Sequence, residues 1–126
     1  MIATGFTLDS GALIALERRH DRVMRLLRWA VDRNVPATVP AVVLAEWWRG
    51  RTDVRERIRR AVLVEPMDAA LGCAAGDAMA AVRGATTIDA IVMASAARRG
   101  DVVLTSDIGD LERLTRHFGA VRILAV

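Results

Sequence analysis

The chain has 126 residues, of which 53% are hydrophobic, and a formal net charge of +3. This length suits one domain that buries its own core, and no apolar run approaches the roughly 18 residues that a membrane span needs. All eighteen basic residues are arginine, and the absence of lysine excludes a P-loop nucleotide site and Schiff-base chemistry.

The single cysteine and the N-terminal segment indicate where in the cell the protein is expected. Cys73 has no partner for an internal disulfide, and we interpret it as a small, buried core residue. The segment Met1–Ser10 lacks a positively charged start and passes directly into a predicted strand, which is not typical of a signal peptide. We therefore expect a cytoplasmic protein with no membrane association.

The first half of the chain alternates short apolar runs with stretches whose apolar residues recur at the helical period. Pro40 suits the first position of a helix that follows a strand. In order, we expect a strand, two helices, a second strand and two more helices. They are predicted at Ala3–Leu8, Ala12–Glu17, Asp21–Asp32, Val35–Val39, Ala41–Gly50 and Thr52–Val62.

The second half continues the alternation. Asp68 is a capping candidate for one helix, and Thr86 and Thr87 are capping candidates for the next. In order, we expect a short strand, two helices, a buried strand, a helix and a last strand at the sheet edge. Five of them are predicted at Leu63–Val64, Ala69–Arg83, Val102–Leu104, Gly109–Phe118 and Val121–Val126, and the second helix follows Thr86 and Thr87 with Asp89 in its first turn.

This order of elements predicts an α/β domain, with a parallel sheet covered by helices on both faces. The strands that end at Asp9 and Asp107 are the most apolar, so we expect them to be central neighbours. Gly72, Gly76 and Ala80 recur every four residues, which leaves one helix edge almost bare of side chains. Such an edge indicates close helix packing, either within the monomer or across a dimer.

Four acids share an unusual setting, because each interrupts or ends an apolar segment. Taken singly, Asp9 and Asp107 suit helix N-caps, Asp89 suits a helix dipole, and Glu46 suits a solvent-facing side of its helix. Since the carboxyl ends of parallel strands meet at one sheet edge, we expect at least Asp9 and Asp107 to lie together there.

Several carboxylates in one crevice repel each other, and a divalent cation relieves that repulsion. An all-oxygen ligand set suits Mg²⁺ or Mn²⁺ rather than Zn²⁺, and His20 and His117 lack a ligand-like spacing. A metal-bound water can be activated as hydroxide for in-line attack on a phosphodiester. The pattern therefore indicates metal-dependent phosphodiester hydrolysis.

Four acidic blocks of the sequence resemble, in their order along the chain, the acidic motifs of PIN-domain ribonucleases. The length of the chain and the order of the blocks are most similar to the VapC toxins of bacterial toxin–antitoxin pairs. The likeness covers essentially the whole chain, and four blocks in order are far more specific than any one of them. The blocks are Leu8–Ile14, Ala45–Gly50, Ile88–Ile91 and Leu104–Leu111.

The resemblance implies a five-stranded parallel sheet, RNA cleavage with Mg²⁺ or Mn²⁺, homodimerisation and inhibition by a VapB-type antitoxin. It also implies that Asp9, Glu46, Asp89 and Asp107 form the acidic metal site. Supporting positions beside them are Asp110, Ser10 and Thr105. The alternative is a catalytically silent PIN-like module that only binds RNA or a protein. A phosphoaspartyl enzyme is disfavoured, because the chain lacks lysine and has Gly11 where a second acid is expected.

The roles of two groups of residues, a tryptophan pair and a set of arginines, remain open. Trp47 and Trp48 replace smaller aliphatic residues that are common in the family, and they indicate either a packed core role or a changed antitoxin groove or base-stacking surface. An arginine-rich helix face is either solvated or a basic strip for RNA or an acidic partner. The candidate binding residues in it are Arg49, Arg55, Arg59 and Arg60, with Arg51 and Arg57 beside them.

Overall fold

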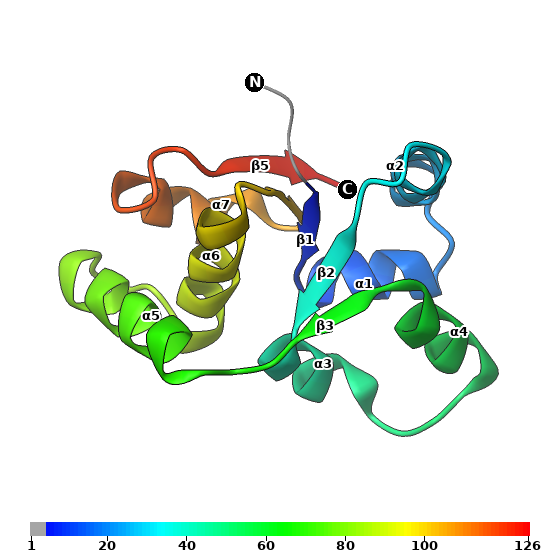
Figure 1. Ribbon diagram of the computed structural model, residues 1–126, viewed down its shortest axis with the longest axis horizontal. Helices are drawn as coiled ribbons and strands as arrows, with labels where there is room; N and C mark the ends of the chain where they lie inside the picture. The colour runs from blue at the N-terminus through cyan, green and yellow to red at the C-terminus, as the bar shows by residue number, and fades with distance from the viewer. Residues whose placement is uncertain (1–4) are drawn as a thin grey trace.

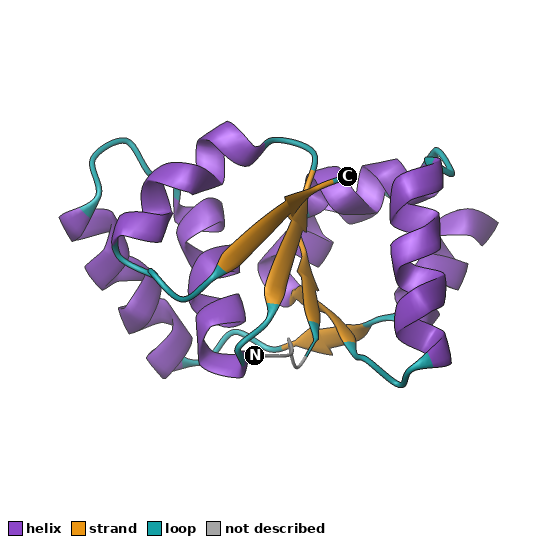
Figure 2. Cartoon of the chain, turned by 90° about the horizontal axis from the view of Figure 1, so that it is seen from above, coloured by secondary structure: helices purple, strands orange, loops and turns teal. Residues whose placement is uncertain are grey.

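The computed structural model describes residues 5–126 and contains one five-stranded, all-parallel sheet with the strand order β3-β2-β1-β4-β5. Figures 1 and 2 show this sheet running through the middle of the molecule, with helices on both sides. The predicted α/β fold and strand number are confirmed. The strands are β1 (Phe6–Leu8), β2 (Ala37–Pro40), β3 (Leu63–Glu65), β4 (Val102–Thr105) and β5 (Arg122–Ala125).

The helices form the outer two layers of the fold. In Figure 1, α5, α6 and α7 lie on one side of the sheet, and α1, α2 and α4 lie on the other. A 3-10 turn, η1, follows α7 directly. The helices are α1 (Ser10–Glu17), α2 (Asp21–Asp32), α3 (Ala41–Trp48), α4 (Asp53–Ala61), α5 (Ala69–Ala81), α6 (Thr87–Arg99) and α7 (Ile108–Glu112), and η1 is Arg113–Arg116.

The two most apolar strands lie side by side at the centre, as predicted. Phe6 pairs with Val102, and Leu8 pairs with Leu104. Leu8 and Leu104 are completely buried, and α6 covers them with an almost unbroken buried segment, Ala90–Ala96. This buried centre fixes the carboxyl ends of β1 and β4. At each of these ends the polypeptide turns from the strand into the next helix.

One local prediction needs correction, and another lies partly outside the described residues. The first strand begins at Phe6, and its predicted start at Ala3 lies outside the described residues. The helix predicted at Gly109–Phe118 is the short α7 followed by η1. There the Thr115 hydroxyl donates a hydrogen bond of 2.5 Å to the carbonyl of Glu112, and this competes with a regular helical ladder.

The exposure of residues on α5 also differs from what the sequence predicts. Cys73 is exposed, so its interpretation as a core residue is wrong. Apart from the adjacent residues and the nearby backbone of α5 itself, no described atom lies within 4 Å of the position where a Cβ would stand at Gly72 or Gly76. The small-residue edge therefore makes no close packing within residues 5–126, and packing across a dimer stays a prediction. Among the same residues, no helix combines the length and hydropathy needed to cross a bilayer.

An ionic network lies beneath α6, against the sheet. The Arg99 guanidinium pairs with Glu65 of β3, and its Nε lies 2.9 Å from Asp101 Oδ2, just before β4. It also donates to the hydroxyl of Thr7 at 2.8 Å and to that of Ser95 at 2.9 Å. Because the Asp101 side chain is only 4% exposed, Arg99 supplies the charge that compensates a buried carboxylate.

Candidate functional site

A cleft of about 580 Å³ opens at the carboxyl ends of β1 and β4. Asp9 and Asp107 follow these strands, Glu46 comes from α3 and Asp89 from the first turn of α6. The structure thus brings all four predicted acids to one concavity, as expected for the edge of a parallel sheet. Asp110 and Ser10 also line it, with Gly11, Ile14, Thr86, Thr87, Ile88, Ser106 and Leu111.

Asp9 begins α1 and faces the cleft at the same time. One of its carboxylate oxygens, Oδ1, accepts a hydrogen bond of 2.9 Å from the backbone N–H of Ala12, which makes it the N-cap of α1. Its own N–H donates to the carbonyl of Leu104 on the neighbouring strand, at 3.3 Å. The capping role therefore coexists with a place in the cleft, because one oxygen satisfies the cap.

Asp107 repeats this arrangement after β4. Its Oδ1 accepts from the backbone N–H of Gly109 at 3.1 Å and caps α7. Its own N–H donates to the hydroxyl of Thr105 at 3.0 Å, and Thr105 is buried at the strand end. Thr105 does not line the cleft but fixes the backbone that carries Asp107.

Gly11 allows these two turns to approach each other. A Cβ built on Gly11 would lie 2.1 Å from the Ser106 hydroxyl oxygen and 3.2 Å from the backbone nitrogen of Ser106. Real Cβ atoms essentially never show contacts under 3.0 Å, and the contact with the backbone nitrogen is also tight, so a side chain at this position would shift both the serine hydroxyl and the β4–α7 turn. The glycine that follows Asp9 and Ser10 therefore sets the spacing between the Asp9 and Asp107 segments.

Burial and mutual repulsion act on the cleft acids. Burial raises the pKa of Asp9, hydrogen bonds from Thr105 and the Ala12 N–H oppose the rise, and the charges of Asp89 and Glu46 add to it. Burial likewise raises the pKa of Asp89, and the charges of Asp110, Glu46 and Asp107 contribute to this rise. Asp9 and Asp89 are thus both raised in part by neighbouring carboxylates, and a bound cation would relieve this repulsion.

The donor set fits a hydrated magnesium or manganese ion. The cleft offers carboxylate oxygens and no histidine or cysteine, which suits hard cations. Within residues 5–126, no three acidic, histidine or cysteine side chains lie close enough together to enclose one ion. Mg²⁺ usually keeps several waters and takes only one or two carboxylates directly, so widely spaced acids remain compatible with it.

The two tryptophans lie elsewhere. Trp47 is only 4% exposed and belongs to the hydrophobic core, so it has no face available for a base, and its candidacy as an RNA contact is wrong. Trp48 is partly buried and packs edge-on against it, with ring centroids 6.1 Å apart. Neither ring lines the cleft. Of the two readings left open by the sequence, the core role holds for Trp47.

The arginine-rich face is largely engaged within the chain. Arg59 and Arg60 both pair with Glu56, at 2.5 and 3.1 Å. Arg49 donates back to the carbonyl of Glu46 at 3.0 Å. The Arg55 side chain is 22% exposed and pairs with Glu17 at 3.2 Å, so it is a structural residue rather than part of an open basic strip.

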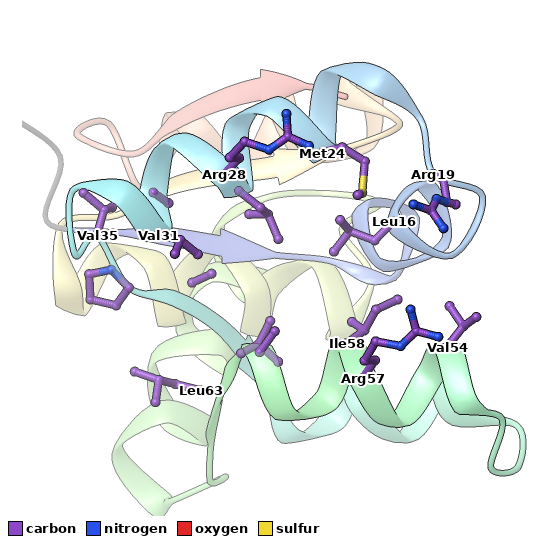
Figure 3. Close-up of a pocket in the computed structure, with 16 residues that line it drawn as sticks. Leu16, Arg19, Met24, Arg28, Val31, Val35, Val54, Arg57, Ile58 and Leu63 are labelled. Carbon is purple, nitrogen blue, oxygen red and sulfur yellow. The ribbon is translucent and has the colours of Figure 1, made fainter.

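A second concavity, which we call the apolar groove, lies between α2 and α4 and has a volume of about 530 Å³ (Figure 3). Val31 and Leu63 in its wall are unusually exposed for aliphatic residues, at 73% and 60%. Sequence reasoning missed it, because its residues come from distant segments whose apolar stripes each suggest ordinary core. Its wall includes Leu16, Arg19, Met24, Leu27, Arg28, Val31, Val35, Val54, Arg57, Ile58, Ala61 and Leu63.

Comparison with known proteins identifies the class. The PIN domain family matches residues 6–116, so the chain belongs to the PIN domain family. No curated protein matches it. Solved structures with the same fold include the complexes named VapBC and FitAB.

Three solved structures show the same fold at low sequence identity. Crystalline DNA-bound VapBC from Salmonella typhimurium matches with a TM-score of 0.71 and 18% identity, over 96% of this chain and 97% of that one. VapBC2 from Rickettsia felis, bound to a promoter DNA fragment, gives 0.69 and 13%, over 96% and 98%. FitAB bound to the IR36 DNA fragment gives 0.68 and 16%, over 95% and 94%.

Proposed function

We propose that this PIN-domain protein is an Mg²⁺- or Mn²⁺-dependent endoribonuclease and acts as the toxin of a toxin–antitoxin pair. One observation carries the proposal: acids from four separate segments of the chain line a single cleft at the carboxyl ends of the central strands. A stable fold gains nothing from such crowding, since burial and repulsion raise the pKa of both Asp9 and Asp89.

The residues of the cleft divide into ligands and supports. Asp9, Glu46, Asp89 and Asp107 would hold the cation, which when bound supplies an activated water and neutralises charge on the phosphate. Asp9 and Asp107 are held rigidly by their capping hydrogen bonds. Asp110 and Ser10 lie beside them in the cleft, and Thr105 holds Asp9 and the backbone of Asp107. Acids with such fixed backbones suit a site that must not rearrange during reaction.

The apolar groove is our proposed docking site for the antitoxin. Arg19, Arg28 and Arg57 stand around an otherwise aliphatic wall (Figure 3), so the groove suits a segment with an apolar face flanked by aspartate or glutamate. The three similar complexes, VapBC, VapBC2 and FitAB, support a partner of this kind. Val31 and Leu63 of the groove remain largely exposed in the part of the chain that the structure describes, residues 5–126. Homodimerisation, as in the family resemblance, is part of the same proposal.

Cleavage of RNA tests the nuclease proposal directly. The purified protein is incubated with total RNA in the presence of Mg²⁺, of Mn²⁺, or of EDTA. We expect discrete fragments with either metal and intact RNA with EDTA. If RNA stays intact with both metals while the protein still retains RNA in a binding assay, the chain is instead a catalytically silent binding module. Cleavage that survives EDTA would overturn the metal-dependent reading.

A further inference from the structure

The region behind Glu46 contains a polar cluster that the proposed chemistry does not use. Trp47 Nε1 donates a hydrogen bond of 2.6 Å to Glu17 Oε1. The other oxygen, Glu17 Oε2, lies 3.2 Å from Arg55 Nε. This nitrogen is buried and makes no hydrogen bond of its own, so the contact is an ion pair without linear geometry. The cluster Glu17–Trp47–Arg55 thus joins α1, α3 and α4.

Arg55 also holds the segment that leaves α3. Its Nη1 donates to the carbonyl of Gly50 at 3.0 Å and to that of Arg49 at 3.3 Å. Arg49 ends the helix in the left-handed region, with φ of 46°, a conformation that non-glycine residues adopt only when their surroundings impose it. Gly50 follows with a positive φ of 99°, so the Arg55 guanidinium binds the carbonyls of both positive-φ residues that end α3.

The helix that carries Glu46 has little stability of its own. α3 has eight residues, and its N-cap, Pro40, offers no side-chain hydrogen bond. Helices this short are marginal in isolation and take their orientation from tertiary contacts. Because consecutive residues are about 100° apart around a helix, burying Trp47 against Glu17 determines where Glu46 points.

We propose that Glu17, Trp47 and Arg55 are positioning residues that fix the rotation of α3 and so hold Glu46 in the acidic cleft. The inference rests on the proposed metal-dependent function. It also links Glu46 to Asp9 by a short rigid path, because α1 begins at the Asp9 cap and ends at Glu17. The cluster thus sets the distance between two acids that enter the cleft from different helices.

Mn²⁺ affinity, measured by isothermal titration calorimetry without RNA, tests this inference. Glu17→Gln keeps an acceptor for Trp47 but loses the charge that pairs with Arg55, and we expect binding to weaken about tenfold. Trp47→Phe removes the donor and keeps an aromatic ring, and it should weaken binding to a similar degree. The matched control is Glu56→Gln, which breaks ion pairs with Arg59 and Arg60 on α4 and should leave affinity unchanged.

A double-mutant cycle separates positioning from general loosening of the fold. If Glu17 acts through Glu46, then Glu17→Gln should have no further effect on Mn²⁺ affinity in a Glu46→Gln background. Additive effects, or unchanged affinity in a folded Glu17→Gln protein, would overturn the inference and leave the metal site standing. If Glu17→Gln does not fold, Arg55→Lys replaces it in the cycle. Absence of Mn²⁺ binding by the unaltered protein would overturn the proposed function itself.

Discussion

Asp9 and Asp107 occupy equivalent positions on neighbouring strands: each follows a central strand and caps the helix that comes next. Each uses an oxygen for a backbone N–H, at 2.9 Å in Asp9 and 3.1 Å in Asp107. The N–H of Asp9 also reaches across to the carbonyl of Leu104, which ties the two turns together. The caps need an oxygen acceptor but no negative charge, and this separates the structural role of each acid from its role in the cleft.

Asp9→Asn should therefore abolish RNA cleavage without harming the fold. Asparagine caps a helix about as well as aspartate, so the free energy of unfolding should change by less than about 1 kcal/mol. Loss of one anionic metal ligand should lower the rate of Mg²⁺-dependent cleavage by roughly 100-fold or more. The measurements are a cleavage time course on total RNA and a urea denaturation curve.

Asp68→Asn is the matched control for that variant. Asp68 caps α5, where Oδ1 accepts from the N–H of Leu71 at 2.8 Å, and it lies outside the cleft. It should keep full cleavage activity. Wild-type activity in Asp9→Asn would show that Asp9 is only a cap.

Metal binding and pH should act on stability through the same carboxylates. Burial raises the pKa of Asp9 and Asp89 in the folded state above the ordinary 3.8. Between 3.8 and the raised values the folded protein binds more protons than the unfolded chain, so the contribution of these groups falls as pH rises through this window. Mg²⁺ at about 100 times its Kd should restore roughly 2.7 kcal/mol, since it binds only the folded protein.

Differential scanning calorimetry at several pH values, with Mg²⁺ or with EDTA, measures both effects. In EDTA, the difference in stability between Asp9→Asn and the unaltered protein should grow as pH rises, because only the latter carries the extra buried charge. Mg²⁺ should stabilise the unaltered protein more at neutral than at acidic pH, since protons compete for the same oxygens. Equal stabilisation of both proteins by Mg²⁺ would place the ion somewhere else.

The sequence predicts the position of a site residue only where the order of strands and helices determines it. Asp9 and Asp107 were predictable together, because the ends of parallel strands always meet at one edge. Glu46 was not, since its apolar neighbours fit a helix that faces either solvent or a site. Only the packing of α3 against α1, through Trp47 and Glu17, decides the matter.

The errors have a related cause. Residue type alone predicts a buried Cys73 and leaves Trp47 open between core and surface, because burial is set by which neighbours the tertiary fold supplies. The exposed side of α5 leaves Cys73 uncovered, whereas Trp47 meets the core and Glu17. The sequence does not reveal the apolar groove for the same reason, since the apolar residues of α2 and α4 look alike whether or not a neighbour covers them.

Substitutions in the apolar groove should separate partner binding from catalysis. Arg28→Glu and Arg57→Glu reverse charge around the groove and should weaken binding of an acidic antitoxin by about tenfold or more, most strongly at low salt. RNA cleavage by the isolated protein should stay unchanged, since neither residue lines the acidic cleft. The measurement is copurification with a co-expressed antitoxin of the proposed kind, at two salt concentrations.

Arg22→Glu provides the control for charge reversal, because Arg22 is an exposed residue of α2 outside the groove. It should copurify as the unaltered protein does. Unweakened copurification of the double variant Arg28→Glu, Arg57→Glu would remove the groove as the docking site.

Gly11→Ala should impair cleavage by displacing the turn that carries Asp107. The added Cβ would overlap the Ser106 side chain, whose hydroxyl oxygen lies 2.1 Å from that position. Because the backbone nitrogen of Ser106 is also close, at 3.2 Å, rotation of the serine alone does not restore the spacing. Cleavage rate and Mn²⁺ affinity should both fall, and adding Ser106→Gly should recover part of each. Failure of Ser106→Gly to recover either property would show that this contact does not control the site.

Arg99→Met should destabilise the fold strongly, although Arg99 lies outside the cleft. It removes the guanidinium whose Nε lies 2.9 Å from the buried carboxylate of Asp101, which should cost about 3 kcal/mol in the free energy of unfolding. Arg98→Met removes a more exposed arginine, whose side chain is 36% exposed, and should cost about 1 kcal/mol or less. Urea denaturation of the two variants at neutral pH makes the comparison, and equal losses would show that the network under α6 is not a buried charge pair.

The pH dependence of this deficit checks its origin. Burial alone would raise the pKa of Glu65, but hydrogen bonds from Ser95 and Arg98 and the charge of Arg99 together lower it below the ordinary 4.5. A lowered folded pKa contributes stability that is present above 4.5 and is lost as pH falls through the folded value. The deficit of Arg99→Met relative to the unaltered protein should therefore shrink in acid. A deficit that is constant from neutral to acidic pH would point instead to lost packing of the arginine stem.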